Sequence, residues 1–300
     1  MDHHHLFDVG GAKLSRLEDL RLIKGEGCYS ADWNLPGQAH AAFLRADRAH
    51  ARILSVNTDA ASKAPGVLGV YTGADAVREG HLRPMSFLTF AGKDGMKARF
   101  PDRSSLAHDR VRFVGDAVAI VVAETALQAQ DAAELIEVEY EDLPVAVDPR
   151  AALAAGAPQL HDNVPGNLAF EQEAGDAAAV EAAFAKAAHV TKLRLDVTRV
   201  APNPMEPRAC SVGYDATSGV YTVHSPVQGI NMMRMQLAAY TGVPEEKINV
   251  EARDVGGGFG QRSIGYPEYC ALMLAAKALK RPVKWVSSRS EGFLSDSHGR

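Results

Sequence analysis

Residues 250–263 of this 300-residue chain, VEARDVGGGFGQRS, pass from a short β-rich run into four glycines that surround one phenylalanine, Phe259. Three consecutive glycines let the main chain approach a ligand closely and adopt positive φ angles. A helical pattern follows, and the order strand, loop and helix is the context in which phosphate-binding loops occur. This stretch therefore decides whether the second half of the chain has a nucleotide-binding fold.

The spacing of the glycine loop does not match the two common nucleotide-binding types. The dinucleotide fingerprint requires G-x-G-x-x-G, but residues 256–261 read G-G-G-F-G-Q. The nucleotide P-loop ends in Gly-Lys-Ser/Thr, whereas Gly260 is followed by Gln261 and Arg262. A nucleotide hydrolase or a nicotinamide dehydrogenase is therefore poorly supported. From its composition alone, the loop is either a ligand-binding turn or a tight turn in which Phe259 anchors the core.

The composition is that of an ordinary globular chain with about two domains: 46% of the residues are hydrophobic and the formal net charge is -5. This charge argues against a nucleic-acid-binding protein, because phosphate neutralisation needs a basic face. No apolar run reaches the roughly 18 residues of a membrane-spanning helix. The wide spacing of Cys28, Cys210 and Cys270 indicates a reducing compartment, so a cytoplasmic location is expected. The histidines at 3–5 are interpreted as a polar tail rather than a metal site.

Residues 16–150 have the pattern of an α+β unit, in which short strand-like runs alternate with helical periods. Residues 77–107 lack a period and are interpreted as a long surface loop or insertion. The expected elements of this unit are a short helix near Thr58–Lys63, a hairpin that turns at Gly115–Asp116, a helix capped by Thr125 and a strand near Glu137–Tyr140.

Residues 148–174 carry Pro149, Pro158 and Pro165 with several alanines and glycines, which predicts a linker across a domain boundary at 151–174. A second unit covers residues 175–300. Its expected elements are a short helix capped by Asp176, a strand from His189, a strand in 219–226, a helix in 229–242 that ends at Gly242, a strand in 247–255 and a helix in 266–282 that buries Cys270.

Five stretches, taken together, resemble the large, molybdenum-binding subunit of the xanthine dehydrogenase/aldehyde oxidase/carbon monoxide dehydrogenase family. Residues 16–53 and 111–149 look like the start and the end of that family's a/b hammerhead domain. The stretches PNPMEPRACSVGYD (202–215), VHSPVQGINMMRMQLAAYTGVPEEKINV (223–250) and DVGGGFGQR (254–262) look like the first part of its molybdopterin-binding region. The resemblance implies an α+β fold: an a/b hammerhead domain at 16–150, followed at 175–300 by the first part of a mixed α/β molybdopterin-binding domain. The chain is expected to continue past residue 300.

The resemblance implies a role for the glycine loop and for Gln228. In the family, the Phe-Gly step lies against the molybdenum centre, with main-chain amides near its oxygen and dithiolene ligands. Gly257, Gly258, Phe259 and Gly260 are therefore the implied cofactor-binding residues. The family also places a glutamine beside the apical oxo ligand, 31 residues before that phenylalanine, and Gln228 stands at this distance from Phe259. Backbone N–H and amide N–H₂ donors suit an anionic centre, which agrees with these roles.

Other positions near these motifs have a weaker assignment. Glu206 and Arg208 of the MEPR segment are predicted to form an ion pair that fixes their loop, and Arg262 either meets an anionic cofactor group or sits at the helix start. Purine-oxidising members of the family carry a glutamate shortly after the glycine loop, where residues 261–264 read QRSI, so xanthine specificity is in doubt. The family's general base, a glutamate, and most of its pterin-dinucleotide contacts are expected beyond residue 300.

The activity that the resemblance implies is that of a molybdenum hydroxylase subunit, which oxidises an aldehyde or an N-heterocycle with oxygen derived from water. The implied cofactor is molybdenum–molybdopterin in its cytosine dinucleotide form. Because the chain has neither iron–sulfur cysteine clusters nor an FAD fingerprint, an FAD-binding medium subunit and a [2Fe-2S] small subunit are the expected partners, in a dimer of heterotrimers. Three alternatives stay open: a non-catalytic fragment that acts as a binding or assembly module, a carbon monoxide dehydrogenase-type large subunit, and a flavin or nicotinamide oxidoreductase unrelated to molybdenum.

Overall fold

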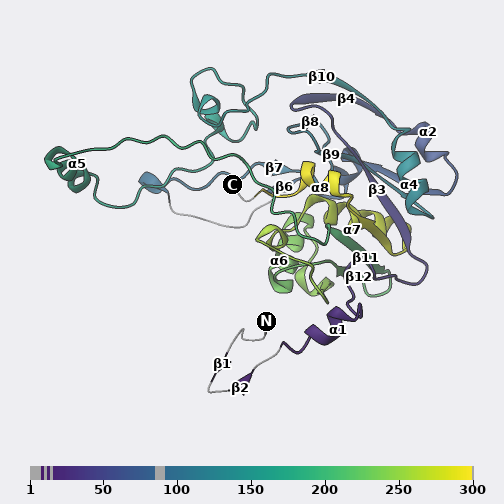
Figure 1. The fold of residues 1–300 in the computed structure, drawn as a ribbon. Helices are drawn as coiled ribbons and strands as arrows, with labels where there is room; N and C mark the ends of the chain where they lie inside the picture. Colours follow the sequence, from purple (N-terminus) through teal and green to yellow (C-terminus); the bar gives the residue numbers. More distant parts are fainter. Residues whose placement is uncertain (1–7, 10–11, 14–15, 85–91, 299–300) are drawn as a thin grey trace.

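The computed structural model describes residues 8–9, 12–13, 16–84 and 92–298 (Figure 1). The predicted polar tail with its histidines at 3–5 lies outside these residues. The central element is a seven-stranded mixed sheet with the order β13-β12-β11-β14-β3-β9-β5. Its strands are β3 (Ala39–Arg45), β5 (Val67–Thr72), β9 (Ala117–Ala123), β11 (Ala209–Asp215), β12 (Val220–His224), β13 (Ile248–Glu251) and β14 (Val283–Val286).

The sheet contains strands from both predicted units. β14 pairs in parallel with β3, with Val283 opposite Ala39. Next to this junction, the ammonium group of Lys284 donates hydrogen bonds to the carbonyl oxygens of Ala31 at 2.6 Å and Trp33 at 2.8 Å. The first and second halves of the chain therefore share one hydrogen-bonded sheet, within the predicted α+β class.

Strand β9 has the sequence AVAIVVA and is buried at every position, as expected for a strand that is covered on both faces. Ile120 and Val122 pack in the cluster that contains helix α7 (Pro267–Leu279). Val121 packs in a second cluster with helix α4 (Ala126–Ala133). The predicted cap of α4 is confirmed, because the hydroxyl oxygen of Thr125 accepts a hydrogen bond from the main-chain N–H of Gln128.

The two helices that flank the glycine loop also follow the sequence prediction. Helix α6 (Ile230–Thr241) ends where Gly242 adopts a left-handed φ of 74°. Helix α7 is buried from Glu268 to Ala276, with Cys270 fully enclosed, which agrees with its apolar sequence. The glycine loop lies between β13 and α7, and α6 packs beside both.

Two predicted elements are wrong. The runs on either side of Gly115–Asp116 do not form a hairpin: β8 (Arg110–Val111) pairs with β4 (Ala51–Asn57), while β9 pairs with β3 and β5. The turn is present, but these neighbouring strands take the hydrogen bonds that a hairpin would have used. No strand forms from His189, because residues 171–200 are all exposed and offer no neighbouring edge to the backbone.

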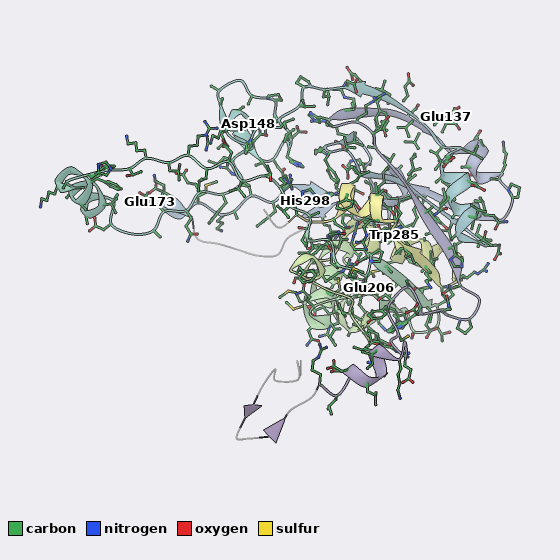
Figure 2. The ribbon with its side chains drawn as sticks, in the orientation of Figure 1. Glu137, Asp148, Glu173, Glu206, Trp285 and His298 are labelled. Atoms are coloured by element: carbon green, nitrogen blue, oxygen red, sulfur yellow. The ribbon has the colours of Figure 1, made fainter. Side chains whose placement is uncertain are left out.

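The remaining elements are short or peripheral. β10 (Glu137–Asp142), β4 and β8 form a three-stranded antiparallel sheet. Helix α5 (Ala177–Lys186), capped by Asp176 as predicted, lies on an arm that extends from the body, where Figure 2 labels Glu173. Among the described residues, no helix is long and apolar enough to cross a membrane. The other elements are β1 (Asp8–Val9), β2 (Ala12–Lys13), α1 (Asp19–Ile23), α2 (Asp59–Ser62), α3 (Gly73–Arg78), β6 (Arg83–Pro84), β7 (Asp102–Arg103), α8 (Arg289–Ser295) and the 3₁₀ turns at Lys93–Gly95, Ala151–Leu153, Pro165–Asn167, Glu245–Lys247 and Gln261–Ser263.

Candidate cofactor-binding site

The glycine loop carries an exposed phenylalanine in an unfavourable backbone conformation. Phe259 has a φ of 50°, and 71% of its surface is exposed. For an L-residue the left-handed region costs roughly 1–2 kcal/mol. Neither its conformation nor its exposure suits a core anchor, so the interpretation of Phe259 as the anchor of a tight turn does not fit. Strained residues of this kind are more readily explained by a site than by stability.

The main chain of the same loop presents hydrogen-bond donors without acceptors. Within the described part of the chain, the N–H groups of Gly257, Gly258 and Phe259 have no hydrogen-bond partner. Positive φ angles of 108° at Gly257 and 85° at Gly260 shape this segment. Successive N–H groups in such a turn form a concavity that binds anions. The donor set therefore fits an anionic, oxygen-bearing or sulfur-bearing group of a cofactor.

Gln228 lies directly against this loop. Its side-chain Oε1 accepts hydrogen bonds from the main-chain N–H of Gly260 at 2.9 Å and from the hydroxyl of Ser263 at 3.3 Å. Because a main-chain N–H can only donate, the amide oxygen must face the loop, and the N–H₂ group must face away from it. Among the described residues, that N–H₂ group has no acceptor. The structure thus brings Gln228 beside the loop with its donor free.

Glycine at position 258 is what allows this contact. A Cβ atom built on Gly258 would lie 2.4 Å from the side-chain Cδ of Gln228, well inside van der Waals contact. Any other residue at 258 would push the amide away from Gly260. The absence of side chains in the glycine run therefore allows the Gln228 side chain, as well as a ligand, to come close to the main chain.

The predicted ion pair between Glu206 and Arg208 is wrong. The two carboxylate oxygens of Glu206 accept main-chain N–H groups instead, from Ser30 at 3.0 Å and from Gly256 at 2.7 Å. Each carboxylate oxygen thus accepts one main-chain N–H, and the two bonds connect the glycine loop to the N-terminal segment. The side chain of Arg208 enters the core, where other acids are available.

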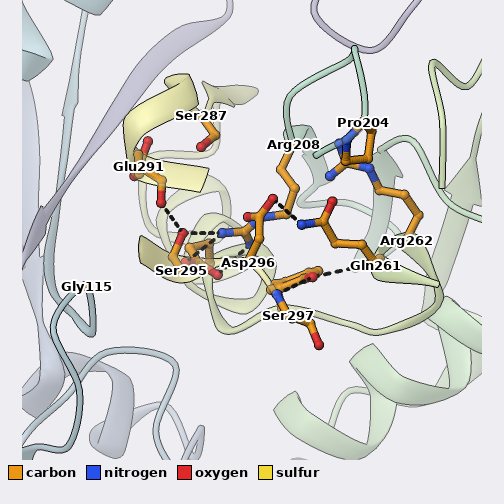
Figure 3. A network of polar contacts seen from close by, with 12 residues as sticks. Gly115, Pro204, Arg208, Gln261, Arg262, Ser287, Glu291, Ser295, Asp296 and Ser297 are labelled. Carbon is orange, nitrogen blue, oxygen red and sulfur yellow. Dashed lines mark hydrogen bonds and ion pairs between the residues drawn. The ribbon is translucent and has the colours of Figure 1, made fainter. Parts of the chain in front are cut away.

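Arg208 is fully buried and organises the network in Figure 3. Its guanidinium pairs with the carboxylates of Glu268, at 3.0 Å, and of Asp296, and it lies 3.9 Å from the centre of the Tyr266 ring. The amide of Gln261, which directly follows the glycine loop, donates to Asp296 at 2.7 Å. The network therefore couples the end of the loop to helices α7 and α8.

Glu268 and Asp296 were missed by the sequence prediction. A signal existed for Glu268, since a carboxylate inside an apolar helix must find a partner. Burial opposes its ionisation, but the guanidinium groups of Arg208 and Arg45 together hold the pKa of Glu268 below its usual range. For Asp296 the sequence offered no comparable signal.

Asp254, at the start of the loop, has a structural role. Both of its oxygens accept from the guanidinium of Arg21 at 2.7 Å, and one also accepts the main-chain N–H of Cys28 at 2.7 Å. The hydrogen bond from Arg21 is the main reason that the pKa of Asp254 lies well below its usual range. A carboxylate held in this way is a poor proton acceptor, and it anchors the loop to the N-terminal segment, as Glu206 does.

Comparison with known proteins identifies two domains in this chain. Residues 24–144 match the model of the aldehyde oxidase and xanthine dehydrogenase a/b hammerhead domain, and residues 160–300 match that of the molybdopterin cofactor-binding domain. The chain is 38% identical to the nicotine 6-hydroxylase large subunit of Paenarthrobacter nicotinovorans, over 99% of this chain and 36% of the relative. It is 36% identical to the carbon monoxide dehydrogenase large chain of Afipia carboxidovorans, over 97% of this chain and 36% of the relative.

A solved structure leads to the same family. Quinoline 2-oxidoreductase from Pseudomonas putida 86 superposes with a TM-score of 0.86 at 36% identity, over 96% of this chain and 36% of that chain. The chain thus spans about a third of the length of these relatives. With two family models that together match most of its residues, the chain belongs to the family of molybdopterin-binding large subunits found in xanthine dehydrogenases, aldehyde oxidases and carbon monoxide dehydrogenases.

Proposed function

We propose that this chain provides one wall of the molybdenum–molybdopterin site of a hydroxylase subunit, which oxidises an aldehyde or an N-heterocycle with oxygen derived from water. The observation that carries the proposal is a set of converging features without partners in the described chain. The main-chain N–H groups of Gly257, Gly258 and Phe259 have no acceptor, and the amide of Gln228 turns its oxygen to the loop and leaves its N–H₂ free.

Each of these groups has a role that follows from its chemistry. The main-chain N–H groups, together with Gly260 that shapes the turn, bind an anionic part of the cofactor without bringing in a charge that could titrate. The N–H₂ of Gln228 would donate a hydrogen bond to an oxo ligand of the bound cofactor. The phenyl ring of Phe259 forms an apolar wall for a flat substrate. When bound, the cofactor would supply the two-electron redox chemistry, and the protein would position the cofactor and the substrate and polarise the reacting groups.

The family relationship supports a multi-subunit setting. Relatives are named as a large subunit or a large chain, so the activity is shared among subunits. We propose an FAD-binding medium subunit and a [2Fe-2S] small subunit as partners, in a dimer of heterotrimers, and the cytosine dinucleotide form of the cofactor. A cytoplasmic location agrees with three free cysteines, two of which are buried.

Metal analysis of the purified complex tests the proposal. The complex is produced together with its partner subunits and cofactor-maturation factors, and molybdenum is measured per chain. A near-stoichiometric molybdenum content with turnover of an aldehyde or an N-heterocycle is expected. Absence of molybdenum would overturn the proposal in favour of an unrelated oxidoreductase, and bound molybdenum without any turnover would favour a binding or assembly module.

A carbon monoxide dehydrogenase-type activity is the second candidate. It is favoured by the 36% identity to a carbon monoxide dehydrogenase large chain, which is close to the 38% identity to the nicotine hydroxylase. The same complex, assayed with carbon monoxide, an aldehyde and an N-heterocycle side by side, separates the two. Turnover of carbon monoxide alone would replace the first candidate with the second.

A further inference from the structure

Arg262 lies two residues after the last glycine of the loop and forms hydrogen bonds with the segments that carry Glu206 and Gln228. Only 1% of its surface is exposed. One guanidinium nitrogen, Nη2, donates to the main-chain oxygen of Glu206 at 2.5 Å. Its own carbonyl oxygen accepts the main-chain N–H of Gln228 at 3.1 Å. The residue thus connects the segment that holds the loop to the segment that carries the amide donor.

The positive charge of Arg262 is not neutralised by the described part of the chain. Its Nε and Nη1 atoms are buried without a hydrogen-bond partner, and no carboxylate of the described residues forms an ion pair with it within 4.0 Å. Arg208, the other large buried arginine, pairs with two carboxylates. In Figure 3 the Arg262 side chain extends toward Pro204, away from that network.

No nearby ionisable group of the described chain forms an ion pair with Arg262. The carboxylate of Glu206 faces the main-chain N–H groups of Ser30 and Gly256 and makes no contact with the guanidinium of Arg262 within 4.0 Å. Burial raises the pKa of the Tyr269 phenol, and the nearby positive charge of Arg262 lowers it only in part. The phenol is therefore neutral at physiological pH. A buried charge without a partner costs several kcal/mol. This chain therefore carries a destabilising cation at the base of a loop whose N–H groups already favour an anion.

We infer that Arg262 is a positioning residue that places a buried positive charge under the glycine loop, and that this charge strengthens the binding of an anionic cofactor group by the N–H groups of Gly257, Gly258 and Phe259. The inference rests on the proposed function and deepens it. Bound anion and buried cation attract each other across the loop in a medium of low dielectric constant, so each removes part of the desolvation cost of the other.

Charge and hydrogen bonding can be separated by two substitutions. Arg262→Gln removes the charge but keeps a donor for the main-chain oxygen of Glu206, whereas Arg262→Lys keeps both the charge and a donor. Arg253→Gln is the matched control, because Arg253 precedes the same loop and carries the same charge, but is less buried and lies over the ring of Trp33. All are made in the full complex with its partner subunits.

Two measurements are taken on each variant. The first is the content of molybdenum and of released pterin per folded chain, after size exclusion and equilibrium dilution. The second is the melting temperature of protein from a host that cannot make the cofactor. For Arg262→Gln we expect cofactor affinity about tenfold lower, which corresponds to about 1.4 kcal/mol, and a melting temperature of the cofactor-free protein that is equal to or above that of the wild type. Arg262→Lys and Arg253→Gln should keep the cofactor.

The outcomes separate this inference from the proposed function. A loaded wild type with an equally loaded Arg262→Gln variant overturns the inference alone. The inference also fails if Arg262→Lys loses as much cofactor as Arg262→Gln, since charge would then not be the cause. A wild type without molybdenum overturns the proposed function, and the inference with it.

Discussion

At the scale of single residues, Gln228 is the side chain whose removal should affect catalysis most with least effect on folding. Gln228→Ala deletes one preorganised donor, and loss of such a donor typically slows turnover by about 10²–10³-fold. The side chain is exposed, so the free energy of unfolding should change by less than about 0.5 kcal/mol. Turnover per bound molybdenum, measured beside a thermal melt, checks both numbers. Turnover of Gln228→Ala at the wild-type rate would show that Gln228 has no role in the site.

Gly258→Ala should reproduce that defect without touching Gln228. The added methyl group would stand 2.4 Å from the Gln228 Cδ and displace the amide from the N–H of Gly260. Gly229→Ala is the control, because its added Cβ would meet only Met232, at an ordinary 3.7 Å. We expect turnover to fall at least about tenfold for position 258 and to stay within about twofold for position 229. A change in turnover within about twofold for Gly258→Ala as well would show that the loop tolerates a side chain at 258.

The sequence located the candidate site but not the residues that support it. The spacing between Gln228 and Phe259 matches the family pattern and predicts that both residues belong to one site. In the structure, the side chain of Gln228 contacts the loop. The partners of Glu206 could not be predicted, because Ser30 lies 176 positions away in the chain and contributes only its main-chain N–H. Local pattern carries no information about such a bond. The charge of Arg262 was visible, but its lack of a counter-ion within the described chain emerges only in three dimensions.

At the scale of elements, helix α7 depends on the ion pairs of Glu268. Its carboxylate meets Arg208 at 3.0 Å and Arg45 at 2.9 Å, fully inside the protein. Glu268→Gln should lower the free energy of unfolding by about 3 kcal/mol, near the lower end for breaking a buried pair, because Asp296 and Glu291 still face the two arginines. Glu79→Gln, which breaks an exposed pair with Lys277, should cost less than about 1 kcal/mol. Urea unfolding at pH 7 measures both, and similar losses would contradict the buried-pair argument.

The same carboxylate predicts how stability depends on pH. The folded-state pKa of Glu268 lies below its ordinary value of 4.5, so its ionised form stabilises the folded state. That contribution is complete well above about pH 4.5 and is lost as the pH falls toward the folded-state pKa. The melting temperature of the wild type should therefore fall more between about pH 6 and pH 4 than that of Glu268→Gln. Parallel curves for the two proteins would show that Glu268 does not titrate with unfolding.

Elements that depend on a local sequence pattern were predicted correctly. The predictions that failed concern strands, whose pairing depends on residues far away in the sequence. The Thr125 cap, the end of α6 at Gly242 and the buried α7 all follow from residues within a few positions of each other. The hairpin at Gly115–Asp116 failed because β9 pairs with two other neighbours along its backbone. A strand from His189 failed because its alternating pattern has no edge to join within the described chain.

At the scale of the whole molecule, β14 pairs in parallel with β3, so we expect the two halves of the chain to unfold as one cooperative unit. Lys284 fastens this junction, with its buried ammonium bound to two main-chain carbonyls and to the side-chain oxygen of Asn34 at 3.0 Å. Lys284→Met would leave those oxygens without a donor, at a cost of about 2–3 kcal/mol. Because β9 and β11 belong to the same sheet, we expect the main-chain N–H groups of both strands to lose protection against hydrogen exchange together.

Hydrogen exchange followed by mass spectrometry measures this directly. In Lys284→Met the opening free energies of β9 and β11 should fall by the same amount, although β9 belongs to the first half of the chain and β11 to the second. Lys247→Met is the control, because Lys247 donates to a single carbonyl at the surface and should change neither strand by more than about 0.5 kcal/mol. A loss of protection confined to β11 would mean that the first half is stable by itself, with the shared sheet acting as a contact between two independent domains.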